Sequence, residues 1–211
     1  MKRIVLIGAS GHGKVCAEIA KLNGYGDIIF LDDNLDVKRC SNYNVVGSTS
    51  DFYQFINDDT DFFVSIGNHE IRKQIQEKIE NAGGTIKTLI HPQAIISEDV
   101  SFGAGTVVMA GVVINPGTKI GKGTIINTSS SVDHDCRIGD WCHVAVGSHI
   151  CGMVSVGVGC WIGAGSIVSN NISVCDEVFT GAGAVVVHDI QESGTYVGVP
   201  AKRIKGEVLN K

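Results

Sequence analysis

The sequence contains few of the residues that mark disordered, fibrous or membrane-spanning chains. Of its 211 residues only 3 are Pro, 6% are aromatic and 18% are charged, whereas 44% are hydrophobic. A hydrophobic fraction of that size can bury a core, which excludes wholesale disorder. The longest nearly apolar stretch, residues 107–114, is far shorter than the ~20 residues that span a bilayer. The segment before Gly8 has only five apolar residues, and a signal peptide needs a longer apolar run. We therefore expect a cytoplasmic protein with no membrane span.

Blocks of basic residues and paired cysteines are also missing. The net charge is −5, so nucleic acid is not expected as a partner. The 7 Cys form an odd number with no C-x-x-C pair, which favours reduced thiols over disulfides. No compact spacing of His, Cys or Asp is typical of a metal site, and no metal is expected.

Glycine is abundant and unevenly distributed. Residues 1–95 hold 9 of the 27 Gly and 22 charged residues, whereas residues 96–211 hold 18 Gly and 17 charged residues. This shift in composition predicts two domains, residues 1–92 and residues 93–211, the second ending in a C-terminal tail.

The first domain alternates strand and helix patterns. Short apolar runs at 4–7, 28–31, 62–66 and 86–90 predict buried parallel strands, and helical spacing predicts helices at 13–23 and 69–82. This order is typical of a small Rossmann-like α/β domain.

Polar and glycine residues follow three of these strands. Gly8-x-x-Gly11-x-Gly13 follows the first, Asp32-Asp33 the second and Gly67-Asn68 the third. Backbone N–H groups in such a glycine-rich turn can bind a phosphate, and the carboxyl ends of parallel strands share one edge of a sheet. The glycine spacing departs from G-x-G-x-x-G, and by itself it could also suit NAD.

The second domain is a repeat of six residues. Stepping by six from Ile96 to Val186 gives sixteen positions, of which all but Thr180 are apolar. Gly recurs three residues before many of these positions, where a turn with positive φ would need it. A period of six cannot form an amphipathic helix. It predicts a three-sided prism in which each hexad supplies one short strand and one corner, so that three consecutive hexads complete one coil.

These hexads resemble the left-handed parallel β-helix of the hexapeptide acyltransferases. Three further stretches narrow the resemblance: Gly8-Ala-Ser-Gly-His-Gly13, the run Asn127-Thr-Ser-Ser-Ser-Val-Asp-His-Asp-Cys136, and Gly198-Val-Pro-Ala-Lys202. Together they resemble bacterial sugar acetyltransferases with an N-terminal nucleotide-binding domain. Within that group, the chain looks most similar to the N-acetyltransferases of UDP-linked 4-amino-deoxy-sugars, as in bacillosamine synthesis for glycan precursors. The related sialic acid type, a sugar O-acetyltransferase, is the alternative.

The resemblance implies an acetyl-CoA-dependent transferase with His134 as general base. A His titrates near neutral pH and can take the proton of an attacking amine. The family places its acidic partner at Asp135, although Asp133 on the other side is a rival. Asn127 corresponds to a family residue near the acceptor sugar, or it is a corner amide that joins adjacent coils.

Other family positions concern acetyl-CoA. Gly152 follows His134 by one coil, and its N–H could polarise the thioester carbonyl. His143 resembles a family residue at the acetyl-CoA site. Ala164 and Ala182, which are also one coil apart, would leave a shallow groove for the pantetheine arm, although ordinary turn residues would look the same.

The resemblance also implies a nucleotide-sugar site in the first domain, a homotrimer, and active sites between subunits. A non-catalytic nucleotide-sugar sensor that uses the β-helix only to trimerise is a third hypothesis. The residues expected to bind the UDP-amino-sugar are Ser10, Gly11, His12, Asp32, Asp33, Gly67 and Asn68.

Overall fold

The computed structural model describes residues 2–34 and 36–204. The chain divides into two compact units, Met1–Pro92 and Gln93–Lys211. Within the described ranges no helix combines the length and the apolar character that crossing a membrane requires.

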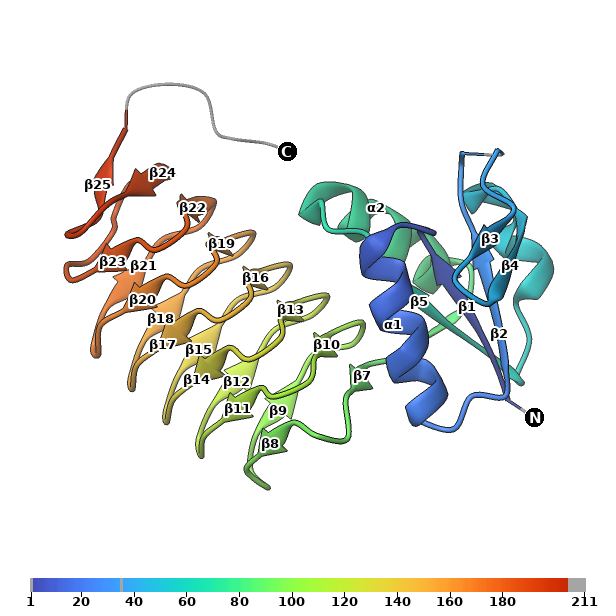
Figure 1. The fold of residues 1–211 in the computed structure, drawn as a ribbon, viewed down its shortest axis with the longest axis horizontal. Coiled ribbons are helices and arrows are strands. Elements are labelled where there is room, and N and C mark those ends of the chain that lie inside the picture. The colour runs from blue at the N-terminus through green and yellow to red at the C-terminus, as the bar shows by residue number, and fades with distance from the viewer. Residues whose placement is uncertain (1, 35, 205–211) are drawn as a thin grey trace. The chain divides into compact units, whose positions relative to one another are not determined.

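The first unit is a small α/β domain built on one mostly parallel sheet (Figure 1). The strand order is β3-β4-β2-β1-β5-β6, and only β3 runs antiparallel to its neighbour. Its core is an apolar cluster that combines strand residues such as Val5, Leu31 and Phe62 with Phe52 and Ile79 from the helices. The elements are β1 (Arg3–Ile7), α1 (Gly11–Leu22), β2 (Asp27–Leu31), β3 (Arg39–Cys40), β4 (Tyr43–Gly47), the 3-10 helix η1 (Thr49–Phe55), β5 (Thr60–Val64), α2 (His69–Asn81), β6 (Thr85–Ile86) and β7 (Leu89–Ile90).

The predicted Rossmann-like class is confirmed, but several boundaries are wrong. The first helix begins at Gly11 rather than residue 13, because Ser10 adopts the extended backbone of an N-cap. The single strand expected at 86–90 is two short strands, β6 and β7. The hairpin of β3 and β4 and the 3-10 helix were not predicted.

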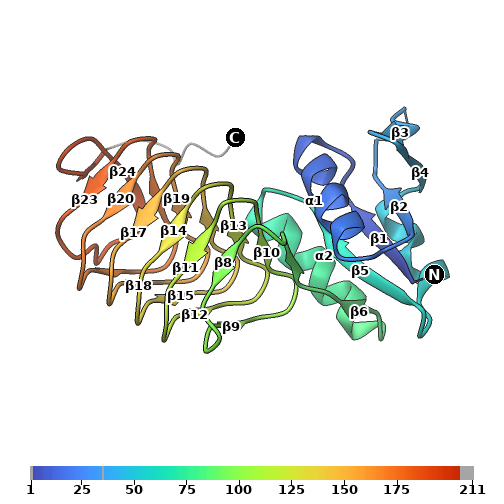
Figure 2. The same ribbon diagram turned by 60° about the horizontal axis from the view of Figure 1, so that its bottom comes forward.

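The second unit is a parallel β-helix with the three faces that the hexads predict, of the left-handed class that the resemblance implies (Figures 1 and 2). Three ladders of short strands form its faces, and each strand pairs with the strand one coil away, as Val113 does with Ser131. Face 1 contains β10 (Val107–Val108), β13 (Ile125–Ile126), β16 (His143–Val144), β19 (Trp161–Ile162), β22 (Val178–Thr180), β24 (Gly194–Val197) and the antiparallel β25 (Lys202–Arg203). Face 2 contains β8 (Ile95–Ile96), β11 (Val113–Ile114), β14 (Ser131–Val132), β17 (His149–Ile150), β20 (Ile167–Val168) and β23 (Val185–Val186). Face 3 contains β9 (Ser101–Phe102), β12 (Lys119–Ile120), β15 (Arg137–Ile138), β18 (Ser155–Val156) and β21 (Ser173–Val174).

The chain turns a corner between consecutive faces. We name these corner 1–2, corner 2–3 and corner 3–1. The small residue of each hexad points inward and ties the coils together: the Oγ1 of Thr118 donates to Asp133 O at 2.8 Å, and the Sγ of Cys136 donates to Cys151 O at 3.1 Å. A buried hydroxyl or thiol thereby satisfies a corner carbonyl of the next coil. This stacking sets the height of each corner residue relative to its counterpart one coil away.

Candidate active site

His134 lies on corner 2–3, directly after β14. Its side chain is 52% exposed, and Nδ1 lies 2.9 Å from Asp135 Oδ2. A carboxylate at Nδ1 holds the proton there, which leaves Nε2 free to accept another. The hydrogen bond to Asp135 raises the pKa of His134. Desolvation lowers this pKa, whereas the charges of Asp133 and Asp135 raise it further. The geometry suits a general base.

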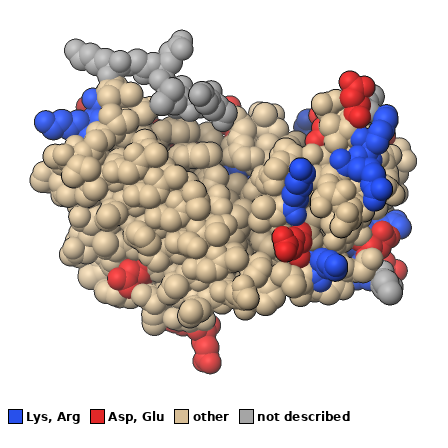
Figure 3. Space-filling view, viewed as in Figure 1, with Lys and Arg blue, Asp and Glu red and all other residues tan. Residues whose placement is uncertain are grey.

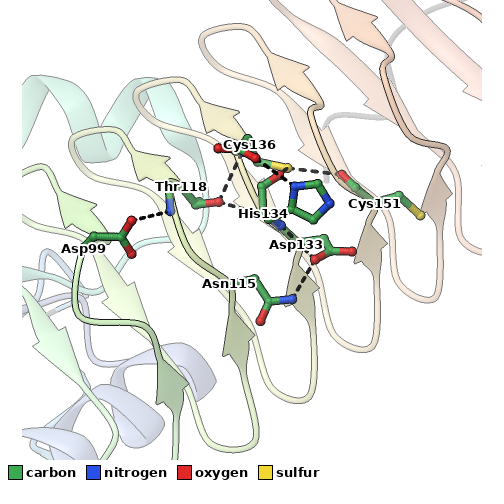
Figure 4. A network of polar contacts seen from close by, with 9 residues as sticks. Asp99, Asn115, Thr118, Asp133, His134, Cys136 and Cys151 are labelled. Atoms are coloured by element: carbon green, nitrogen blue, oxygen red, sulfur yellow. Dashed lines mark hydrogen bonds and ion pairs between the residues drawn. The ribbon is translucent and has the colours of Figure 1, made fainter.

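The two acidic neighbours of His134 make different contacts. Asp135 contacts the ring, whereas Asp133 accepts from the backbone N of His134 at 2.8 Å and from Asn115 Nδ2 at 2.6 Å (Figure 4). These two hydrogen bonds lower the pKa of Asp133. Asp135 holds the left-handed φ of 59° that its corner requires, a conformation that Asp tolerates.

Gly152 lies one coil after His134 and against its ring. A Cβ at this position would lie 2.6 Å from His134 Nε2 and 2.8 Å from Cε1. The imidazole therefore occupies the space that a side chain would fill. The N–H of Gly152 has no hydrogen-bond partner among the residues that the structure describes.

Sequence reasoning missed a second glycine of this corner. Gly117 lies one coil before Asp135, with φ of 74°, and a Cβ there would lie 2.5 Å from Asp135 Oδ1. Gly117 thus makes room for the carboxylate in the same way that Gly152 makes room for the imidazole. The spacing of one coil, which relates Gly152 to His134, was the signal that could have revealed it.

Asn127 and His143 come together elsewhere, where corner 1–2 meets face 1. Asn127 Oδ1 accepts from Thr128 N at 2.7 Å, so its Nδ2 faces His143 Nε2 at 3.0 Å. His143 is buried, and its ring packs edge-on against Trp161 with 4.1 Å between centroids. Asn127 therefore joins two coils. Within one chain it lies on a different corner from His134.

Ala164 and Ala182 also lie on corner 1–2. They stack one above the other, with Gly183 N donating to Ala164 O at 2.8 Å. Ala182 is exposed and Ala164 is partly exposed. Of the four positions predicted to bind acetyl-CoA, only Gly152 shares a corner with His134.

In the first unit, the loop after β1 is shaped by its glycines. Gly8 has φ of 104°, and a Cβ there would lie 2.7 Å from Ile66 Cγ1. A Cβ at Gly13 would overlap the carbonyl oxygen of Gly8. The fold therefore requires these two glycines, whereas a Cβ at Gly11 would meet nothing within 4 Å. Ser10 is exposed at the N-cap of α1, and its side chain forms no cap hydrogen bond.

The polar residues after β2 brace this loop. Asp32 Oδ2 accepts from Ala9 N at 2.6 Å, and its Oδ1 accepts from Asn34 N at 2.8 Å. Asp33 Oδ1 accepts from Thr49 N at 2.8 Å. Both carboxylates lie at the predicted edge of the sheet and already bind backbone N–H groups of their own chain.

After β5, Gly67 and Asn68 lie immediately before the second helix. Asn68 caps α2 by accepting from Ile71 N at 3.0 Å. Gly67 O and Ile66 O both accept from the buried guanidinium of Arg72, each at 2.8 Å. Asn68 therefore has a structural role as the N-cap of α2, and Gly67 has one as an acceptor for Arg72.

His12 is partly buried on the first turn of α1, with Nε2 3.6 Å from Cys16 Sγ. Burial, with the nearby charge of Arg72, lowers the pKa of His12 to about 4. His12 is therefore a neutral group at neutral pH. Arg72 was missed as a neighbour of this loop, because sequence periodicity does not show which charged side chain of a helix turns inward.

Among the described residues, no three His, Cys, Asp or Glu side chains are grouped so that they could hold a metal ion.

Comparison with known proteins places both units in context. The family model described as the PglD N-terminal domain matches residues 3–79. A UDP-N-acetylbacillosamine N-acetyltransferase of Bacillus subtilis (strain 168) is 33% identical over 116 residues, which are 52% of each chain. The match thus spans about half the length of that curated relative.

Two similar solved structures match over almost the whole chain. The acetyltransferase domain of PglB from Neisseria gonorrhoeae FA1090, in complex with acetyl coenzyme A, is 38% identical with a TM-score of 0.92, covering 96% of this chain and 99% of that one. PerB from Caulobacter crescentus, in complex with CoA and GDP-perosamine, is 37% identical with a TM-score of 0.91, covering 98% of each chain.

Proposed function

Because this chain belongs to the hexapeptide-repeat N-acetyltransferases of nucleotide-linked amino sugars, we propose that it transfers the acetyl group of acetyl-CoA to the amino group of a UDP-linked 4-amino-deoxy-sugar. The observation that carries the proposal is the His134–Asp135 pair, whose ring lies against Gly152 on an exposed corner. The Bacillus subtilis relative is an N-acetyltransferase named for a UDP-linked amino sugar, and PerB was solved with GDP-perosamine, which supports an amine rather than a hydroxyl as acceptor.

His134 acts as the base in this reaction. The neutral amine attacks the thioester carbonyl carbon, and a C–N bond forms. Nε2 of His134 takes the proton from that nitrogen, while Asp135 stabilises the resulting imidazolium through Nδ1. Collapse of the tetrahedral intermediate breaks the C–S bond, and the imidazolium returns the proton to the departing CoA thiolate. The product is an amide, and the base is regenerated.

Gly152 contributes the second catalytic feature. The carbonyl oxygen gains negative charge as the amine attacks, and the free N–H of Gly152 is a suitable donor beside Nε2. A single such donor contributes about 10²- to 10³-fold to kcat in other acyl-transfer enzymes. No metal takes part in this scheme.

A cyclic homotrimer explains why the predicted residues fall on two corners. Face 2 lies between corner 1–2 and corner 2–3, and its outward strand positions carry no Lys, Arg, Asp or Glu. Ile95, His149 and Ile167 are exposed there. Figure 3 shows few Lys, Arg, Asp or Glu side chains on the visible surface of the β-helix. If the trimer forms through face 2, corner 2–3 of one subunit meets corner 1–2 of the next. His134 then shares an inter-subunit site with Asn127, Ala164 and Ala182.

The first unit supplies the nucleotide-sugar site. Ser10, Gly11 and His12 offer backbone N–H groups at the start of α1, where a diphosphate is stabilised. The open space at Gly11 is the observation that favours a ligand there. Gly67 and Asn68 flank the same sheet edge, and Asp32 and Asp33 shape it. We also propose a cytoplasmic location, where acetyl-CoA is made.

The test is an acceptor screen that follows CoA thiol release. We expect release with a UDP-linked 4-amino-sugar, and a loss of about 10²- to 10⁴-fold in kcat for His134→Ala. Activity only with a GDP-linked amino sugar would mean that the substrate carries GDP rather than UDP. Activity only with sialic acid would establish the O-acetyltransferase alternative, and binding without turnover would favour the sensor.

A further inference from the structure

Corner 2–3 contains a second carboxylate, Asp133, which the proposed reaction does not use. Its Oδ1 accepts two hydrogen bonds, from Asn115 Nδ2 at 2.6 Å and from the backbone N of His134 at 2.8 Å. Asn115 follows β11 and lies one coil before Asp133 (Figure 4). Asn115 is the only side chain among the described residues that donates to this carboxylate.

The backbone of the turn is held by other contacts. Asp133 O accepts from Thr118 Oγ1 at 2.8 Å, Asp135 N donates to Pro116 O at 2.9 Å, and Met153 N donates to His134 O at 2.9 Å. Loss of Asn115 would leave all three in place. What Asn115 adds is the orientation of the Asp133 carboxylate, the group that accepts from the N–H of His134.

The charges of nearby carboxylates also act on the imidazole of His134. The titratable groups of its own turn are Asp133, Asp135 and the thiol of Cys136, whose Sγ lies 3.6 Å from His134 O. Asp99 lies two coils earlier on the same corner, where it accepts from Gly117 N, and Cys151 belongs to the next coil. Of these, Asp133 and Asp135 raise its pKa through their charges. Asp133 carries that charge without touching the ring, so its position decides how strongly it acts.

We propose that Asn115 is a positioning residue of the acyl transfer, which holds Asp133 against the backbone of His134 so that the imidazole stays in place over Gly152 with a fixed negative charge beside it. This inference rests on the proposed function for its effect on turnover. Its effect on the imidazole itself does not require that function.

Two substitutions distinguish the effect of holding Asp133 in position from the effect of its negative charge. Asn115→Ala removes the donor, and we expect kcat at the high-pH plateau to fall about 10- to 100-fold, because a small misplacement of a catalytic group is costly. The KM for acetyl-CoA should stay within about twofold, since no binding group is lost. Asp133→Asn keeps an oxygen acceptor for both donors but removes the charge. It should move the acid limb of the kcat/KM profile to lower pH.

A matched control exists on corner 3–1. Asp176 Oδ1 accepts from Val158 N at 2.7 Å, which is also a hydrogen bond between adjacent coils. Asp176→Ala should therefore lower the melting temperature about as much as Asn115→Ala, yet leave kcat and the pH profile unchanged. Equal kcat for Asn115→Ala and Asp176→Ala would overturn the positioning role.

NMR titration of the His134 imidazole tests the role of Asn115 independently of the proposed acetyl transfer. The midpoint should fall in Asp133→Asn and in Asn115→Ala, even if no acceptor sugar is turned over. An unchanged midpoint in both variants would contradict the inference, whatever the enzyme acetylates. If the wild type were inactive but the midpoint fell, the proposed function alone would fail.

Discussion

Gly152→Ala should disable the base while leaving the fold intact. The new Cβ would lie 2.6 Å from His134 Nε2, whereas ordinary contacts begin near 3.4 Å, so the ring must retreat by about 0.8 Å. Because that ring belongs to a half-exposed side chain, it can swing into solvent, and the backbone at Gly152 does not require a positive φ. The stability cost should therefore stay below about 1 kcal/mol.

The catalytic cost should be much larger. Moving the imidazole breaks its 2.9 Å contact with Asp135 and takes Nε2 away from the attacking nitrogen. A misplacement of about 1 Å can cost about 10²-fold, so we expect kcat to fall about 10- to 100-fold, equivalent to about 1.4–2.7 kcal/mol. Thermal denaturation and steady-state kinetics on the same sample would measure both effects.

A double-mutant cycle supplies the control. In a His134→Ala background there is no ring to displace, so Gly152→Ala should change kcat by less than about twofold. If Gly152→Ala left kcat unchanged in the wild-type background, the argument from the ring contact would be refuted. If it were equally harmful in both backgrounds, the loss of kcat would not come from displacement of the His134 ring.

Other contacts of the molecule can be tested in the same way. Asp135→Asn should lower the plateau rate and move the acid limb of kcat/KM to lower pH, because the carboxylate raises the pKa of His134 and the base works only when neutral. Gly117→Ala and Gly111→Ala both place Ala at a φ near +70° and should each lose about 1–2 kcal/mol of stability, but only Gly117→Ala, whose Cβ meets Asp135, should lose activity. Because the pKa of His12 is lowered to about 4 in the fold, stability should fall as the pH drops from 6.5 to 4 by up to about 3 kcal/mol, and His12→Gln should flatten that slope in denaturant titrations.

The β-helix could be predicted because a repeat of six residues determines which side chains point inward and which residues stack one coil apart. Every sixth residue from Ile96 points inward, and a coil of three hexads correctly placed Gly152 beside His134. The α/β domain was predictable only in class. The β3–β4 hairpin has short strands, and β4 alternates between exposed and partly buried positions without a buried apolar face. A strand that packs weakly leaves little hydrophobic signal in the sequence.

Side-chain direction was the part that spacing could not give. The two neighbours of His134 are both Asp, and only the left-handed backbone at Asp135 turns its carboxylate toward the ring. Asn115 gave no signal, because a corner amide looks the same whether it faces solvent or the next coil. Asn127 was expected with His134, but the hexad order puts it on the neighbouring corner, where its contact is His143.

The chemical nature of the reaction product is the direct test of N-acetylation by this protein. The enzyme would be incubated with acetyl-CoA and a UDP-linked 4-amino-deoxy-sugar, and the sugar product examined by mass spectrometry before and after mild alkaline hydroxylamine. We expect the addition of one acetyl group that survives hydroxylamine, because an amide resists it, and almost no product with His134→Ala. A labile ester, or full product formation without His134, would contradict this expectation.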